Sequence, residues 1–100
     1  MNEHSLSFPE DYAVDAPIWE SKGFYCEACL RAGGRSYRLF FYEPVRLAQD
    51  IAADLGQCGA FFEPNLVVVA AVNREHMERA ARWLVETRQL TALKPEADAP

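Results

Sequence analysis

The expected order of secondary-structure elements occurs twice along this chain, and this duplication constrains the fold more than any other feature. Residues 35–42 (RSYRLFFY) predict a strand that leads directly into a helical segment opened by Pro44. Residues 65–72 (NLVVVAAV) predict a second strand that leads into a helical segment opened by Asn73. A strand-like segment precedes each of these strands, so the pattern is strand, strand, helix, and then the same again.

Two ββα units of this kind can pair into one compact domain. We therefore predict an α+β fold with a four-stranded antiparallel sheet in the spatial order 1-2-4-3 and two helices on one face, which is a permuted ferredoxin-like arrangement. A different two-layer α+β fold is the alternative. Residues 23–92 form the single domain in this interpretation, residues 1–22 an acidic leader or arm that is partly irregular, and residues 93–100 a disordered C-terminal tail.

The first two strands form a hairpin whose register follows from its turn. Gly33-Gly34 suits a two-residue turn that needs positive φ at both positions. This turn places Ala28 opposite Leu39 and Cys26 opposite Phe41, which makes one face of the hairpin almost wholly apolar. The other face is mixed, and it includes Tyr25, Glu27, Cys29, Arg31, Ser36, Arg38, Phe40 and Tyr42.

Both helical segments carry start signals in the sequence. Pro44 suits a first helical turn, and apolar residues follow at helical spacing until Gly56, which we expect to end the helix. Asn73 is a favourable N-cap for the second helix. Residues 58–62, between these helices, predict the short third strand.

The segment Leu66–Val72 predicts a strand that is buried on both sides. It shows no alternation of polar and apolar residues, although a strand with one solvated face should alternate. Phe40, Tyr42 and Phe61 are expected to join it on the face without helices. Either a second copy of the chain or the apolar residues of the leader, Trp19 among them, would then cover this face, and we favour a homodimer.

The sequence contains few groups that suggest catalysis. Cys26 and Cys29 form a C-x-x-C pair, but an offset of three within a strand sends the two thiols to opposite faces rather than to one metal ion. His76 is the one histidine of the expected domain, and it shares a helix flank with Trp83. We therefore predict no catalytic residues, no metal and no cofactor.

The charge distribution bears on the class of partner. Residues 1–22 carry five acidic residues against Lys22, and residues 23–92 carry eight acidic residues against eight arginines, in a chain of net charge −5. Nucleic-acid affinity depends on neutralising phosphates, so nucleic acid is not an expected partner. The octamer at 35–42 loosely resembles the RNP1 signature of RNA-recognition motifs through Tyr37 and Tyr42, but it departs from that signature at Ser36, Arg38 and Leu39.

Localisation and function follow from the remaining composition. No apolar run approaches the roughly 20 residues of a membrane helix. Three cysteines suggest a reducing compartment, so a cytoplasmic protein is expected. We predict a small non-catalytic interaction or regulatory module that forms a homodimer through its sheet and has room for a protein partner. The alternative is a small-molecule-binding protein or cofactorless enzyme with a pocket at the sheet or dimer interface. The residues expected to face a partner or ligand are Tyr25, Arg38, Phe40, Tyr42, Phe61, His76, Trp83 and Trp19.

Overall fold

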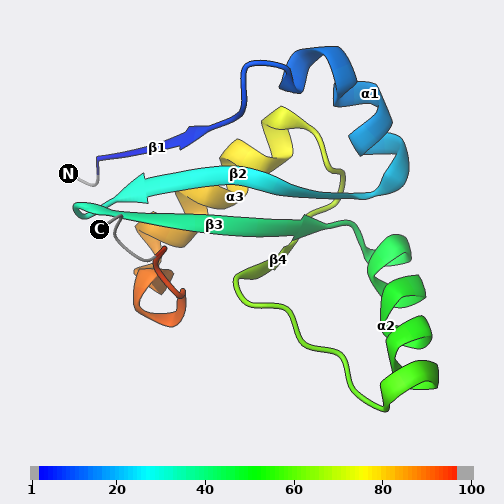
Figure 1. The fold of residues 1–100 in the computed structure, drawn as a ribbon. Helices are drawn as coiled ribbons and strands as arrows, with labels where there is room; N and C mark the ends of the chain where they lie inside the picture. Colours follow the sequence, from blue (N-terminus) through cyan, green and yellow to red (C-terminus); the bar gives the residue numbers. More distant parts are fainter. Residues whose placement is uncertain (1–2, 97–100) are drawn as a thin grey trace.

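The structure is a computed structural model that describes residues 3–96. Its elements are β1 (His4–Ser7), α1 (Tyr12–Lys22), β2 (Phe24–Ala32), β3 (Arg35–Tyr42), α2 (Pro44–Cys58), β4 (Leu66–Val68), α3 (Arg74–Glu86) and the 3-10 helix η1 (Gln89–Ala92). One sheet holds the strands in the order β1-β2-β3-β4. The first three strands are antiparallel, whereas β4 runs parallel to β3. Figure 1 shows α3 lying across the sheet and α2 standing beyond the end of β3.

The predicted α+β class with a four-stranded sheet is confirmed, but the predicted topology is wrong. The order is 1-2-3-4 with mixed directions, not 1-2-4-3 antiparallel, so the arrangement is not the expected ferredoxin-like one. Residues 58–62 do not form the third strand, because α2 runs past Gly56 and ends at Gly59, whose φ is 78°. The leader supplies the remaining strand as β1, which pairs with β2.

The expectation that Leu66–Val72 forms a central strand buried on both sides is also wrong. This segment lies at the edge of the sheet, and only Leu66–Val68 forms a strand. The reason is that β4 begins beside Phe40 and runs in the same direction as β3. Since β3 ends at Tyr42, only three of its residues remain to pair with β4. Val69 and Val72 then turn into the core against α3, while Val68 is 51% exposed.

A bulge in β2 changes which residues face the core. The register near the turn is the predicted one, with Ala28 opposite Leu39, but a shift between Tyr25 and Ala28 places Tyr25 opposite Phe41. Tyr25 therefore lies on the helix-covered face, where it is only 1% exposed. The extra residue of a bulge reverses the faces beyond it, and the hairpin turn could not reveal this.

The core lies between the sheet and the helices α1 and α3. It contains the buried residues Tyr12, Tyr25, Ala28, Leu30, Ala32, Tyr37, Leu39, Phe41, Val69, Val72, Met77, Ala81, Leu84 and Val85. The aromatic rings of Tyr12 and Trp19 in α1 approach the ring of Tyr25 to 5.1 and 5.4 Å between centroids. The leader, expected to be partly irregular, thus contributes β1 to the sheet and α1 to its helix-covered side. Of the tail expected at residues 93–100, residues 97–100 lie outside the described residues.

Candidate interaction surface

The face of the sheet opposite α1 and α3, called the open face below, divides into a polar half and an aromatic half. Cys29 and Arg38 lie opposite each other in the polar half, near the hairpin turn. Phe24 and Tyr42 lie opposite each other in the aromatic half, near the start of α2. Since β4 is in parallel register with β3, Val68 lies beside Tyr42 and extends the aromatic half to the sheet edge.

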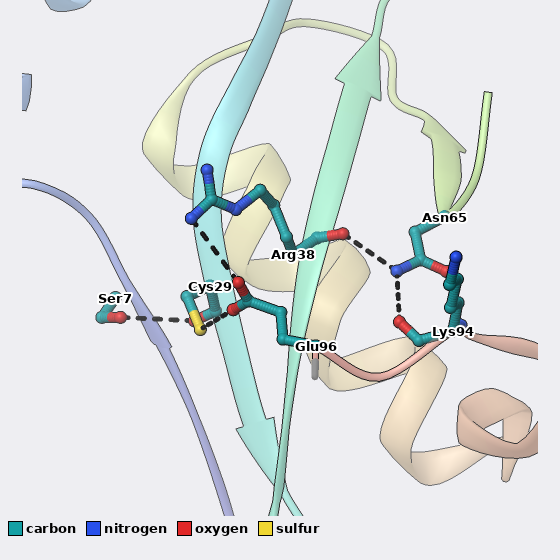
Figure 2. A network of polar contacts seen from close by, with 6 residues as sticks. All are labelled: Ser7, Cys29, Arg38, Asn65, Lys94 and Glu96. Carbon is teal, nitrogen blue, oxygen red and sulfur yellow. Dashed lines mark hydrogen bonds and ion pairs between the residues drawn. The ribbon is translucent and has the colours of Figure 1, made fainter. Parts of the chain in front are cut away.

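Glu96 covers the polar half of the open face. Its carboxylate lies 3.6 Å from Arg38 Nη2 and accepts a hydrogen bond of 3.5 Å from the Cys29 thiol (Figure 2). Both partners of this ion pair are partly exposed, so the pair adds at most about 1 kcal/mol to stability. Its effect is to place the C-terminal segment across the sheet rather than to stabilise the fold strongly.

Asn65 fixes this C-terminal segment beside β3. Its side-chain amide donates hydrogen bonds to the carbonyl oxygens of Arg38 and Lys94 at 3.0 and 2.8 Å, and its Oδ1 accepts one from the Lys94 amide at 2.7 Å (Figure 2). The Glu96 amide then donates to the Ser36 carbonyl at 2.8 Å. Residues 94–96 thereby occupy the edge of β3 that the short β4 leaves unpaired.

Stacked rings form the aromatic half of the open face. The rings of Phe40 and Tyr42 stack with centroids 5.1 Å apart and planes 10° apart, and Phe24 lies 6.3 Å from Phe40. Phe61, from the loop that follows α2, meets Tyr42 edge-on at 6.5 Å. Aromatic pairs in these geometries contribute about 0.5–1.5 kcal/mol beyond their burial, so this row of rings is a rigid platform.

A polar contact joins α2 to this platform. The Tyr42 hydroxyl donates a hydrogen bond of 2.6 Å to Asp50 Oδ2, and Arg46 Nε donates one of 2.9 Å to Asp50 Oδ1. The Arg46 guanidinium also lies over the Phe24 ring, 4.7 Å from its centroid. Glu43 caps the helix by accepting hydrogen bonds from the amides of Val45 and Arg46. The first turns of α2 are therefore held in place, while no residue of this helix is fully buried.

The contact between Tyr42 and Asp50 shifts the pKa of both groups. Burial, and then the hydrogen bond to Asp50, raise the pKa of the Tyr42 hydroxyl above its ordinary value. The same hydrogen bond, with help from Arg46, lowers the pKa of the Asp50 carboxyl. Near neutral pH the pair is therefore a neutral phenol donating to a carboxylate, which is the strong, charge-assisted form of this bond.

We expect Tyr42→Phe to destabilise the protein by up to about 1.5–3 kcal/mol near neutral pH, because a hydrogen bond to a charged group is lost. The pKa of Asp50 should rise toward its ordinary value, as measured by NMR titration of the carboxyl carbon. A carboxyl with a lowered folded-state pKa stabilises the fold above its unfolded pKa of about 3.9, and that contribution disappears as pH falls through the folded value. The stability difference between wild type and Tyr42→Phe should therefore shrink in acid. A difference independent of pH would contradict this account.

Large apolar side chains surround the aromatic half without covering it. Leu47 and Ile51 of α2 are half-buried, but Leu55, one turn further along the helix, is exposed. Phe62, in the loop that follows α2, is 82% exposed. Val45 on α2 and Val68 on β4 are also exposed, so large apolar side chains are exposed both at the edge of the open face and on α2.

The structure brings some of the predicted site residues together and separates others. Phe40, Tyr42 and Phe61 lie together on the open face, with Arg38 further along the same strand. Trp19 and Tyr25 instead pack against each other on the helix-covered side. Tyr37, the third residue of the octamer that resembles RNP1, is likewise a core residue.

His76 and Trp83 line a separate pocket of about 310 Å³ on α3. The other lining residues are Val69, Ala70, Arg79 and Ala80. Asn73 Oδ1 accepts a hydrogen bond from the His76 amide at 2.9 Å and lies 2.8 Å from His76 Nδ1. Since an amide oxygen only accepts, Nδ1 is the donor in this contact, which holds the ring in place. Trp83 is 56% exposed, so the pocket is a shallow apolar one with a fixed imidazole at its side.

The thiols of Cys26 and Cys29 are partly buried in the sheet. Burial raises the pKa of the Cys29 thiol, and its hydrogen bond to Glu96 raises it further. Burial also raises the pKa of Cys26, with Glu27 adding to the effect. Both groups stay protonated near neutral pH and are weak nucleophiles. Within residues 3–96, no group of three or more His, Cys, Asp or Glu side chains is arranged to hold a metal ion.

Sequence reasoning missed several residues that shape this surface. The role of Asp50 could have been inferred from the sequence, because Arg46 precedes it by four residues on the same helix. No sequence pattern indicated the roles of Asn65 and Glu96, because their partners lie on strands distant in sequence. Phe62 was expected to lie in a strand that does not form.

Comparisons with protein-family models, with curated proteins and with solved structures found no match for this chain. Among the described residues, no helix is both long enough and apolar enough to cross a membrane.

Proposed function

We propose that this protein is a small, non-catalytic cytoplasmic interaction module that forms a homodimer through the open face and α2. The observation that carries the proposal is that large apolar side chains are left exposed near the aromatic half of the sheet, at Leu55, Phe62 and Val68. Exposed apolar side chains of this size are typical of protein interfaces when they gather in one region. Three free cysteines, which would persist in a reducing compartment, support the cytoplasmic part of the proposal.

The position of α2 supports the need for a partner. A helix of 15 residues is marginal in water without tertiary packing, because the initial helical turn is unfavourable to form. The contact with Tyr42 supports only the first turns of α2. The half of the helix that carries Leu55 lies beyond the sheet (Figure 1) and would gain its packing from another molecule.

A second copy of the chain is the partner that we propose. The leader packs on the opposite side of the sheet through Tyr12 and Trp19, and it reaches the open face through the edge-on contact of Trp19 with Phe24, 5.8 Å between ring centroids. In a dimer with two-fold symmetry, the apolar side of α2 in one subunit would cover the aromatic half of the other, and the reverse. One contact of this type would therefore be made twice.

We expect Val68→Glu to convert a dimer to a monomer, weakening self-association by about 100-fold or more. Glutamate at this half-exposed position would place a charge in the interface, which costs several kcal/mol when the charge is unpaired, and the change is made twice in a symmetric dimer. Sedimentation equilibrium of the full chain at micromolar concentration measures the effect. Phe62→Ser, in a loop where no helix or strand can be disrupted, should act in the same way.

The matched control is Val14→Glu. Val14 is 79% exposed on α1, at the far side of the sheet from the open face, so the same substitution there should leave self-association unchanged. A wild-type protein that stays monomeric at several hundred micromolar would reject the homodimer. Equal effects of Val14→Glu and Val68→Glu would reject the open face as its interface.

The second candidate is a small-molecule-binding protein, and the pocket beside His76 favours it. Its volume of about 310 Å³ is at the lower end of the range for ligand sites. If the wild-type protein and the open-face variants are all monomeric, ligand binding at this pocket is the better explanation of the protein's function.

A further inference from the structure

A second and larger cleft, of about 870 Å³, opens at the hairpin end of the sheet. It is bounded by the turn between β2 and β3, by the start of β1, and by η1 together with the end of α3. Figure 1 places this end of the sheet opposite the end where α2 stands. The cleft is thus separate from the surface proposed above for self-association.

Unpaired arginines distinguish this cleft from the rest of the molecule. Arg31, Arg35 and Arg88 line it, and Glu3 is the one acidic residue among the lining residues. The ion pairs of the described residues use the other arginines Arg38, Arg46, Arg74 and Arg79. Three of the four arginines without an ion pair among residues 3–96 therefore line one cleft, in a chain of net charge −5.

The backbone at Arg88 supports a role for its side chain. Its φ is 59°, in the left-handed region that an arginine rarely adopts and that glycine or asparagine would adopt more easily. The carbonyl oxygens at this helix end already accept hydrogen bonds. The Trp83 carbonyl accepts from the amide and the hydroxyl of Thr87, and the Val85 carbonyl accepts from the Arg88 amide. The arginine is thus not required to cap the helix with its side chain.

The cleft also has apolar lining. Ala32, Val85 and Leu90 contribute to it. Arginine presents a planar fork of N–H donors that matches the oxygens of a phosphate or a carboxylate. Arg31 follows Cys29 by two residues in β2, so its side chain leaves the sheet on the open face, whereas Arg35 lies opposite the buried Ala32 on the helix-covered side. We propose that this cleft binds a small organic anion, with a phosphate or carboxylate group held by Arg35 and Arg88 and an apolar part against Val85 and Leu90. This proposal is independent of self-association.

Isothermal titration of the full chain with phenyl phosphate and with benzoate tests the proposal and separates the two anions. We expect at least one probe to bind, with an affinity that falls as salt is added. Arg35→Ala should weaken binding by about tenfold or more, because a charge-assisted hydrogen bond is lost. Arg88→Gly should do the same, and glycine suits the backbone at this position, so lost binding would not reflect misfolding.

The matched control is Arg82→Ala. Arg82 is an exposed arginine of α3 that lines no part of this cleft and makes no ion pair within residues 3–96, so its removal lowers the net charge by the same amount. Binding of either probe should be unchanged in this variant. An absence of heat with both probes at millimolar concentration, or an equal loss of affinity in Arg82→Ala and Arg35→Ala, would overturn the proposal.

Discussion

Tyr25→Ala should destabilise the protein by about 3–5 kcal/mol, which is the cost of removing a large aromatic side chain from a well-packed core. Tyr25 is 1% exposed, and its ring contacts Phe8, Tyr12 and Trp19. Phe8 lies in the loop that follows β1, and Tyr12 and Trp19 belong to α1, so the substitution removes the ring against which α1 and this loop pack. A loss of this size is a large fraction of the roughly 5–15 kcal/mol that keeps a domain folded.

Urea unfolding followed by tryptophan fluorescence measures this loss, since Trp19 reports on the leader. Amide exchange should show α1 becoming unprotected before the hairpin of β2 and β3. Tyr25→Phe is the control, because it keeps the ring and removes only the hydroxyl, whose pKa burial raises to about 12. A Tyr25→Ala protein as stable as Tyr25→Phe would show that the leader does not depend on this ring.

Gly23→Ala should cost about 2–5 kcal/mol and disturb the start of α2. Gly23 has a φ of 79°, and a Cβ added there would lie 2.8 Å from Glu43 Oε1 and 2.9 Å from Arg46 Cβ. The left-handed backbone costs about 1–2 kcal/mol for a residue with a Cβ, and overpacking adds roughly 1–3 kcal/mol. Because the carboxylate of Glu43 caps α2, the amides of Val45 and Arg46 should also lose protection from hydrogen exchange.

Gly59→Ala separates the two causes. Gly59 ends α2 as Gly23 ends α1, with a φ of 78°, but an added Cβ there would meet no atom within 4 Å. This variant should lose only the backbone contribution of about 1–2 kcal/mol. Chemical denaturation of both variants gives the comparison, and equal losses would mean that the close approach to Glu43 has no energetic consequence.

The hairpin shows how far the sequence reaches and where it stops. Gly33-Gly34 and the alternation that follows it predicted the pairing of Ala28 with Leu39, which the structure confirms. The bulge that brings Tyr25 into the core was not predictable, because nothing in residues 24–28 favours an extra residue at that point over a regular ladder. The face of every residue beyond a bulge is set by what packs against it.

The candidate surface was only partly predictable for a related reason. Phe40 and Tyr42 lie two apart on one strand, so the sequence was enough to place them on one face. The position of α2 after the end of β3 decided two further contacts. It brought Phe61 to the ring of Tyr42, and it placed Asp50 where it accepts a hydrogen bond from the Tyr42 hydroxyl. Arg31, Arg35 and Arg88 line one cleft only because α3 ends near the hairpin turn.

Local signals alone determined the turn of the hairpin, the start of α2 at Pro44 and the Asn73 cap of α3. They also determined the α+β class, since each of these elements depends on residues close together in the chain. The tertiary structure decided the strand order, the direction of β4 and the use of the leader as β1 and α1. The segment Leu66–Val72 makes the difference plain. Its uniform apolar character is explained by Val69 and Val72 entering the core after three strand residues, and that outcome depends on β3 ending at Tyr42, far away in the sequence.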